Sequence, residues 1–214
     1  HKASVLMLTG KLKGCSDSPP LASWISRFRQ GSLLSMNPDE KQAKSLDACE
    51  LTPITSVANA EVKLLRSLHE RKYRRKTGWF LAEGMRICIE ALQLGHAPVR
   101  IVYAVGREAE PDLSTLIAAC QKSGGRVLPV TEHLLSRISR KENAQMVIGA
   151  FVQKWTKIDE INACLSSAGC WVALDRVRDP GNLGTILRTA DAAEAAGIIL
   201  IGDCTDPYSV EAVL

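Results

Sequence analysis

A dense run of basic residues is the first feature of this sequence that could do chemistry. Residues 71–76 read RKYRRK, so five cations fall within six positions, and Lys63, Arg66 and His69 precede them. Clustered lysine and arginine side chains neutralise phosphate, the main term in nucleic-acid affinity, and Tyr73 could stack on an unpaired base. The alternative is a solvated helix end, because cations favour helix C-termini. The candidate nucleic-acid-binding residues are Arg71, Lys72, Arg74, Arg75 and Lys76.

A second stretch, DPGNLGTILRTADA at residues 179–192, lies between an apolar strand and a predicted helix. Gly181 and Gly184 permit a tight turn and the close approach of another segment, and Asn182 is a natural helix N-cap. The stretch is therefore either a strand–turn–helix junction or a phosphate-binding helix N-terminus. It lacks the lysine of a P-loop and the glycine spacing of a dinucleotide fingerprint.

Arg188 is the residue of this stretch that most needs an explanation. It lies between Leu187 and Ala190 in a predicted helix that is otherwise small and apolar. A guanidinium stays charged at physiological pH, so in such surroundings it needs a partner or a task. The partner could be Asp191, three residues further along.

The amino-acid composition argues against several classes of site and partner. The net charge of +4 is too weak to name a partner by itself. The 7 cysteines include no CxxC pair, which argues against zinc sites and disulfide frameworks and indicates reduced thiols. No apolar run approaches the roughly 18 residues of a membrane span. We therefore expect no metal site, no membrane partner and a cytoplasmic location.

The first 35 residues differ from the rest of the chain. They are rich in serine and basic residues, with Asp17 as the only acid. Such a composition is typical of an organelle transit peptide, which keeps organellar import open as an alternative location. Because no clear amphipathic helix is visible there, we prefer a disordered extension.

From residue 54 onward the pattern changes to alternating helices and strands. Asn59 and Thr131 can cap helices, and Gly95 can end one. Strands are predicted at 79–82, 99–105, 126–130, 146–152, 170–177 and 198–201, and helices at 85–94, 113–120 and 182–196. This alternation predicts an α/β fold in which helices cover a sheet, followed by a second β-α-β unit.

At this point two stretches resemble one family. Residues 172–205, with the core DPGNLGTILRTADA, look like the first motif of the SpoU (TrmH-like) RNA methyltransferases of the SPOUT superfamily. Residues 54–106 resemble that family's N-terminal substrate-binding domain. Its signature there is Asn59, Lys63, Leu68 and Arg71, followed by GWFLAEG at 78–84.

The resemblance implies a fold and an activity. Members transfer a methyl group from S-adenosylmethionine to RNA, usually to a ribose 2′-oxygen in rRNA or tRNA. They act as homodimers and combine a small L30-like α/β domain with a SPOUT α/β domain that ends in a trefoil knot. By motif match Arg188 is the catalytic arginine and Asn182 the motif's invariant asparagine. No cofactor-binding residue is assigned here, because we expect that pocket after residue 214.

The resemblance also suggests domain boundaries. We expect a disordered or extraneous extension at 1–50, an RNA substrate-binding domain at 51–152, a linker at 153–169 and the N-terminal portion of an incomplete SPOUT domain at 170–214. This sequence departs from the family pattern at Glu194, where the family usually has glycine. On helical spacing Glu194 would fall on the apolar face of the predicted helix at 182–196.

Other functions remain open from the sequence alone. One alternative is a catalytically inactive RNA-binding protein, because the cofactor motifs are not found in these residues. Another is a nucleotide- or phosphate-binding α/β domain, which would explain the GNLGT turn but neither Arg188 nor the basic run. Methylation of a base rather than a ribose is also open, and the sequence does not identify the RNA.

Overall fold

The computed structural model describes residues 3–7, 52–156 and 170–213. The predictions made for residues 8–51 and for the connector at 157–169 lie outside this range. No helix within the described residues is long and apolar enough to cross a membrane.

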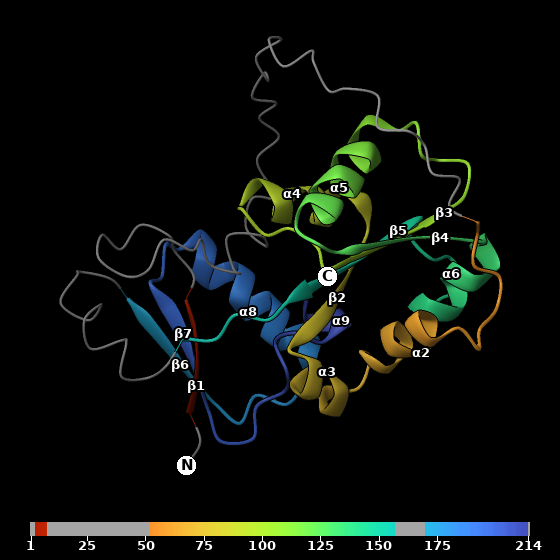
Figure 1. The fold of residues 1–214 in the computed structure, drawn as a ribbon. Helices are drawn as coiled ribbons and strands as arrows, with labels where there is room; N and C mark the ends of the chain where they lie inside the picture. The colour runs from red at the N-terminus through yellow and green to blue at the C-terminus, as the bar shows by residue number, and fades with distance from the viewer. Residues whose placement is uncertain (1–2, 8–51, 157–169, 214) are drawn as a thin grey trace, which may run out of the picture.

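The larger sheet within the described residues has the strand order β2-β5-β3-β4 (Figure 1). Strand β5 runs antiparallel to β2 and β3, whereas β3 and β4 are parallel. The strands are β2 (Trp79–Glu83), β3 (Arg100–Ala104), β4 (Arg126–Val130) and β5 (Val147–Val152). The covering helices are α2 (Ala60–Ser67), α4 (Met85–Gln93), α5 (Pro111–Lys122) and α6 (Glu132–Ser139). The predicted α/β fold is confirmed.

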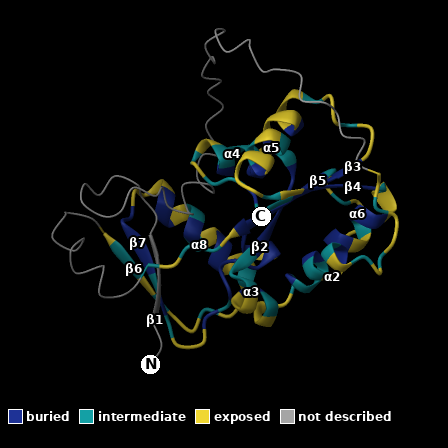
Figure 2. Ribbon diagram, in the orientation of Figure 1, coloured by how far each residue is buried: buried dark blue, intermediate teal, exposed yellow. Residues whose placement is uncertain are grey.

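Both faces of this sheet are buried. Phe80 and Ala82 of β2 belong to the apolar cluster that includes α4 and α5, whereas Leu81 belongs to the cluster that includes α2 and α6. Figure 1 shows these two helix pairs on opposite sides of the strands, and Figure 2 shows the buried strands between them. Burial on both faces is why these strands read as continuous apolar runs rather than alternating patterns.

The smaller sheet has the order β1-β7-β6. Strands β6 (Trp171–Asp175) and β7 (Gly197–Ile201) are parallel and are joined through helix α8 (Pro180–Ala192), which is the predicted β-α-β unit. Strand β1 (Ala3–Met7) pairs antiparallel with β7. These five residues fall in the extension expected to be disordered. They form a strand because the edge of β7 offers unpaired backbone groups.

The two sheets share an apolar core. Tyr208, fully buried, packs its ring against Phe80 with the centroids 4.8 Å apart, and Leu183 and Leu187 of α8 join the same cluster. Helix α9 (Val210–Val213) packs against both α8 and β2. A Cβ atom on Gly184 would lie 2.8 Å from the carbonyl oxygen of Ala212, so glycine at 184 permits the close approach predicted from the sequence.

Side-chain caps mark the start of helices α2, α6 and α8. Asn59 caps α2 by accepting from the N–H groups of Glu61 and Val62, and Thr131 caps α6 by accepting from Leu134, both as predicted. Helix α8 differs: it begins at Pro180, two residues earlier than predicted, with Asp179 as its N-cap. Proline is preorganised for the first helical position, and the carboxylate of Asp179 accepts from the N–H of Asn182 at 2.6 Å.

Helix α8 also ends earlier than predicted: its last residue is Ala192, Ala193 is the C-cap, and Glu194 follows outside the helix. This residue is exposed and left-handed, with φ +55°. Its N–H donates to the carbonyl of Asp191 and that of Ala195 to Ala190, each at 2.9 Å, which is a Schellman ending. The expectation that Glu194 lies on the apolar face is therefore wrong, because the helix stops before reaching it. A left-handed backbone also accounts for the glycine usual at this position in the family.

We expect Glu194→Gly to stabilise the protein. A left-handed conformation costs an L-residue roughly 1–2 kcal/mol, and the extra freedom of glycine in the unfolded chain returns part of this gain. The net effect should be about 0.5–1 kcal/mol, or roughly 1–4 °C in Tm measured by thermal denaturation. The matched control is Ala193→Gly, where φ is −84° and glycine relieves nothing, so Tm should fall. A decrease in both variants would contradict this account of the helix end.

Candidate functional site

The basic run forms a helix of its own. Helix α3 (Arg71–Thr77) follows the turn after α2 and ends at Gly78, whose φ of +70° is left-handed. Gly78 donates its N–H to the carbonyl of Arg74 at 2.8 Å. Arg74, Arg75 and Lys76 occupy the last turn, where positive charge is favourable. The basic run is therefore not the solvated C-terminal end of α2, because it forms a separate helix. Three of its cations do lie in the last turn of that helix, α3.

Arg74 departs from the expected RNA-binding role. Its side chain is 4% exposed and pairs with Asp206, which is 8% exposed, at an Nη2–Oδ2 distance of 2.8 Å. Its Nη1 atom donates to the carbonyls of Leu68 and His69, both at 2.8 Å. The Oδ1 atom of Asp206 accepts from the N–H of Tyr208 at 3.0 Å. With these donors occupied, Arg74 holds the end of α2, helix α3 and the loop after β7 together rather than facing phosphate.

The other cations of α3 are exposed, namely Arg71, Lys72, Arg75 and Lys76. Arg71 also donates from Nη1 to the carbonyl of Cys204 at 3.0 Å, so it touches the loop after β7 while remaining accessible. Tyr73 is half-buried, with the ammonium of Lys72 5.9 Å from its ring centroid. The exposed face of α3 is thus a strip of positive charge with its aromatic residue partly covered.

His69 contributes little positive charge to this strip. Its Nε2 atom lies 2.8 Å from the carbonyl oxygen of Ile138. Burial lowers the pKa of His69, and the nearby cation Arg140 lowers it further, against the raising effects of that hydrogen bond and of Glu83 and Glu211. The ring is therefore neutral near pH 7 and helps to join the turn after α2 to the end of α6.

The predicted role of Asn182 as N-cap is wrong, because Asp179 caps α8. Asn182 is exposed, and its backbone N–H rather than its side chain enters the cap. It lies six residues before Arg188, which separates the two by about 9 Å along the helix and about 120° around it. Within this chain the structure does not bring the two proposed site residues together.

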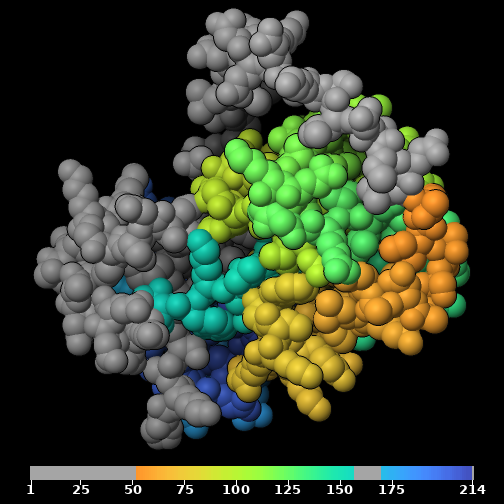
Figure 3. All heavy atoms as spheres, viewed as in Figure 1, coloured from red at the N-terminus to blue at the C-terminus, as the bar shows by residue number. Residues whose placement is uncertain are grey.

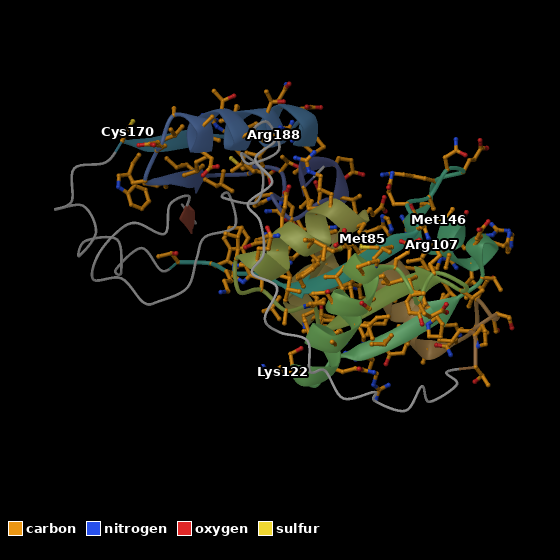
Figure 4. The ribbon with its side chains drawn as sticks, turned by 90° about the horizontal axis from the view of Figure 1, so that it is seen from above. Met85, Arg107, Lys122, Met146, Cys170 and Arg188 are labelled. Carbon is orange, nitrogen blue, oxygen red and sulfur yellow. The ribbon has the colours of Figure 1, made fainter. Side chains whose placement is uncertain are left out.

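Arg188 occupies a partly buried position on α8 (Figure 4). Leu187 and Ala190 beside it are buried. Its Nη2 atom donates to the hydroxyl of Thr185 at 3.2 Å, and its Nη1 atom is buried with no hydrogen-bond partner among the residues that the structure describes. The alternative of an ion pair with Asp191 finds no support within the same residues, since none of the ion pairs described includes Arg188.

The lack of a described hydrogen-bond partner for the Nη1 atom of Arg188 suggests a chemical role for this side chain. Leaving a buried donor of a charged group without an acceptor costs more than leaving a neutral one, so the cost is usually offset by a function. Arg188 keeps one N–H-bearing nitrogen ready for an anionic or polar oxygen. That is what a group needs if it is to stabilise negative charge on a reacting hydroxyl or hold a phosphate.

Other reactive groups in the described residues have structural settings. Burial raises the pKa of Cys88 to about 12 and that of Cys120 to about 11, so both remain uncharged thiols. No group of three or more His, Cys, Asp or Glu side chains in the described part of the chain could hold a metal ion. The chemistry of these residues therefore centres on Arg188 and the exposed cations of α3.

Comparison with known proteins agrees with this geometry. The MRM3-like substrate binding domain model matches residues 59–149, and the SpoU rRNA Methylase family model matches residues 169–213. A tRNA/rRNA methyltransferase described as uncharacterized, from Synechocystis sp., is 34% identical over 163 residues, 75% of this chain and 56% of that protein. A 23S rRNA guanosine 2′-O-methyltransferase from Bacillus subtilis is 32% identical over 73% of this chain and 57% of its own length.

Solved structures give the same result. The AdoMet-bound rRNA methyltransferase from Sinorhizobium meliloti is 45% identical with a TM-score of 0.68, covering 75% of this chain and 58% of that protein. The chain thus spans a little over half the length of each of these three relatives. Helix α3 lies within the stretch that matches the substrate binding domain model, and Arg188 lies within the stretch that matches the SpoU rRNA Methylase model. The chain belongs to the SpoU family of RNA methyltransferases.

Proposed function

We propose that this protein is part of an enzyme that methylates a ribose 2′-oxygen of ribosomal RNA with S-adenosylmethionine as donor. The observation that carries this proposal is the buried Nη1 atom of Arg188, which lies within the SpoU motif and has no hydrogen-bond partner among the described residues. Support comes from relatives named as 23S rRNA 2′-O-methyltransferases and from an AdoMet-bound structural neighbour.

Methyl transfer to a ribose hydroxyl needs positive charge beside the reacting oxygen, and the guanidinium of Arg188 can supply it. A ribose hydroxyl is a poor nucleophile near neutral pH, and a cation beside the developing alkoxide lowers the cost of its charge. Arginine holds its proton too strongly to act as the base, so its role is electrostatic activation and positioning. The cofactor supplies a methyl group already activated on a sulfonium, which leaves alignment as the main task of the protein. None of the described residues is assigned to the cofactor.

We further propose that the exposed face of α3 binds RNA phosphate. Changing Arg75 and Lys76 together to alanine should weaken RNA binding and reduce the slope of log affinity against log salt by about one unit for each lost phosphate contact. Both side chains are exposed, so stability should change little. The measurement is fluorescence anisotropy with a labelled rRNA fragment across a salt series.

The matched control removes two cations from elsewhere. Arg86 and Lys122 are exposed residues of α4 and α5. Alanine at both positions lowers the net charge by the same amount, yet it should leave the salt slope almost unchanged. Equal slopes in the α3 variant and the control would mean that charge number, not the α3 surface, governs binding.

The remaining assignments are proposals drawn from the family. We propose the substrate-binding domain at 51–152, the linker at 153–169 and the SPOUT portion at 170–214, which the two family-model matches support. A homodimer is proposed on the family resemblance. A cytoplasmic location is proposed because the two curated relatives described above are bacterial.

A further inference from the structure

Trp155 is an exposed aromatic side chain that the proposed function has not used. It is one of three large hydrophobic residues exposed among those described, at 42%, and Val152 nearby in the chain is another, at 51%. An exposed tryptophan is costly to leave in water, and tryptophan is enriched where one face must meet a partner. The exposed ring of Trp155 is therefore a candidate contact for a binding partner.

The ring is held in place rather than free. It packs edge-on against Tyr208, with the centroids 5.2 Å apart at an interplanar angle of 72°. Its Nε1 atom donates to the side-chain oxygen of Gln153 at 3.1 Å. The hydroxyl of Tyr208 bonds to both backbone groups of Lys154, which secures the segment that carries the ring. A preorganised ring loses little conformational entropy when a partner stacks on it.

Trp155 also lies beside the end of the basic helix. Gln153 donates its backbone N–H to the carbonyl of Gly78, the residue that ends α3, and its side-chain amide to the carbonyl of Trp79. Figure 3 shows the teal residues at the end of β5 on the same surface as the gold residues of α3 and β2. The exposed cations Arg75 and Lys76 occupy the last turn of α3, next to this junction.

We propose that Trp155 is a stacking platform for an unpaired RNA base whose flanking phosphates contact Arg75 and Lys76. A cationic strip beside an exposed aromatic ring is the arrangement that proteins use to bind single-stranded nucleic acid. The exposed cations of α3 favour a polyanion over a second copy of this chain, which would bring like charges together. This inference rests on the proposed RNA-binding function and adds the conformation of the RNA, since only an unpaired base can stack.

The test compares two variants that keep an apolar side chain against Tyr208. Trp155→Phe retains an aromatic face, whereas Trp155→Leu does not. In anisotropy titrations of the full chain, Trp155→Leu should weaken binding of a labelled single-stranded RNA by between about fivefold and 150-fold, and Trp155→Phe by much less. The salt slope should stay unchanged, because no phosphate contact is lost. Affinity for the same RNA in a perfect duplex should not change.

Controls separate this inference from the proposed function. Val105→Ala alters another exposed apolar residue, 39% exposed, and should bind like the unaltered protein. If Trp155→Leu binds single strands normally while the Arg75, Lys76 variant does not, the platform is wrong and the RNA-binding surface stands. If neither change weakens binding, both proposals fail. A change in sedimentation behaviour with unchanged RNA affinity would assign Trp155 to contacts between protein chains and overturn the proposal.

Discussion

Asp206→Ala is expected to destabilise the protein by about 3–5 kcal/mol, the largest effect on stability that this structure predicts. The change leaves the guanidinium of Arg74 buried at 4% exposure without its carboxylate partner. It also removes the acceptor for the N–H of Tyr208, whose ring packs into the core shared by the two sheets. Urea unfolding, read as the free energy in water, is the measurement.

A matched surface pair gives the control. Arg107 and Glu110 are 39% and 38% exposed, and ion pairs in such positions contribute less than about 1 kcal/mol. Glu110→Ala should therefore cost less than about 1 kcal/mol. Combining Arg74→Met with Asp206→Leu tests the cause: removing both charges should recover most of the loss, because no unpaired ion remains. A double variant as unstable as Asp206→Ala would show that packing, not the unpaired charge, dominates.

Local signals predicted much of the fold. Apolar runs between turn residues located strands β2 to β7 to within two residues or so. For β2 to β5 these runs arise because both faces of the larger sheet are buried. The caps Asn59 and Thr131 were predictable because a short polar side chain before an amphipathic segment satisfies free N–H groups at the helix start. Asn182 was predicted as the cap of α8 from its residue type alone. The proline directly after Asp179 marks the true start of the helix, and the true cap lies three residues before the predicted one.

Features that depend on distant residues were not predictable in this way. Arg74 lies in a run of cations and looks like its neighbours in sequence, yet Asp206, 132 residues away, buries it. Nothing local marks the contact between Tyr208 and Trp155 either, since it arises only when the two sheets pack together. Arg188 is the opposite case. A permanent charge between apolar neighbours was visible in the sequence, and the structure leaves one of its nitrogens buried without a described partner.

Arg188→Ala is expected to reduce methyl transfer by at least two orders of magnitude, the scale seen when one transition-state stabiliser is lost. The assay is single-turnover methylation with labelled S-adenosylmethionine, in a chain that continues past Leu214 over the remaining length of its relatives. Arg188→Lys should restore little, because a point charge on a flexible stem does not reproduce a planar guanidinium. Cofactor affinity, titrated separately, should change little, since none of the described residues is assigned to the cofactor.

Stability distinguishes a catalytic Arg188 from a structural one. Its Nη1 atom has no hydrogen-bond partner among the described residues, so removing the side chain also removes an unsatisfied buried donor. Tm should therefore stay constant or rise in Arg188→Ala while activity collapses, the trade-off expected of a residue retained for function. Thr185→Val keeps the shape of Thr185 but loses the hydroxyl that accepts from Nη2 at 3.2 Å, so it should slow transfer roughly fivefold by loosening the guanidinium. Near-normal turnover in Arg188→Ala, together with a lower Tm, would make Arg188 a structural residue of α8 and remove it from the proposed mechanism.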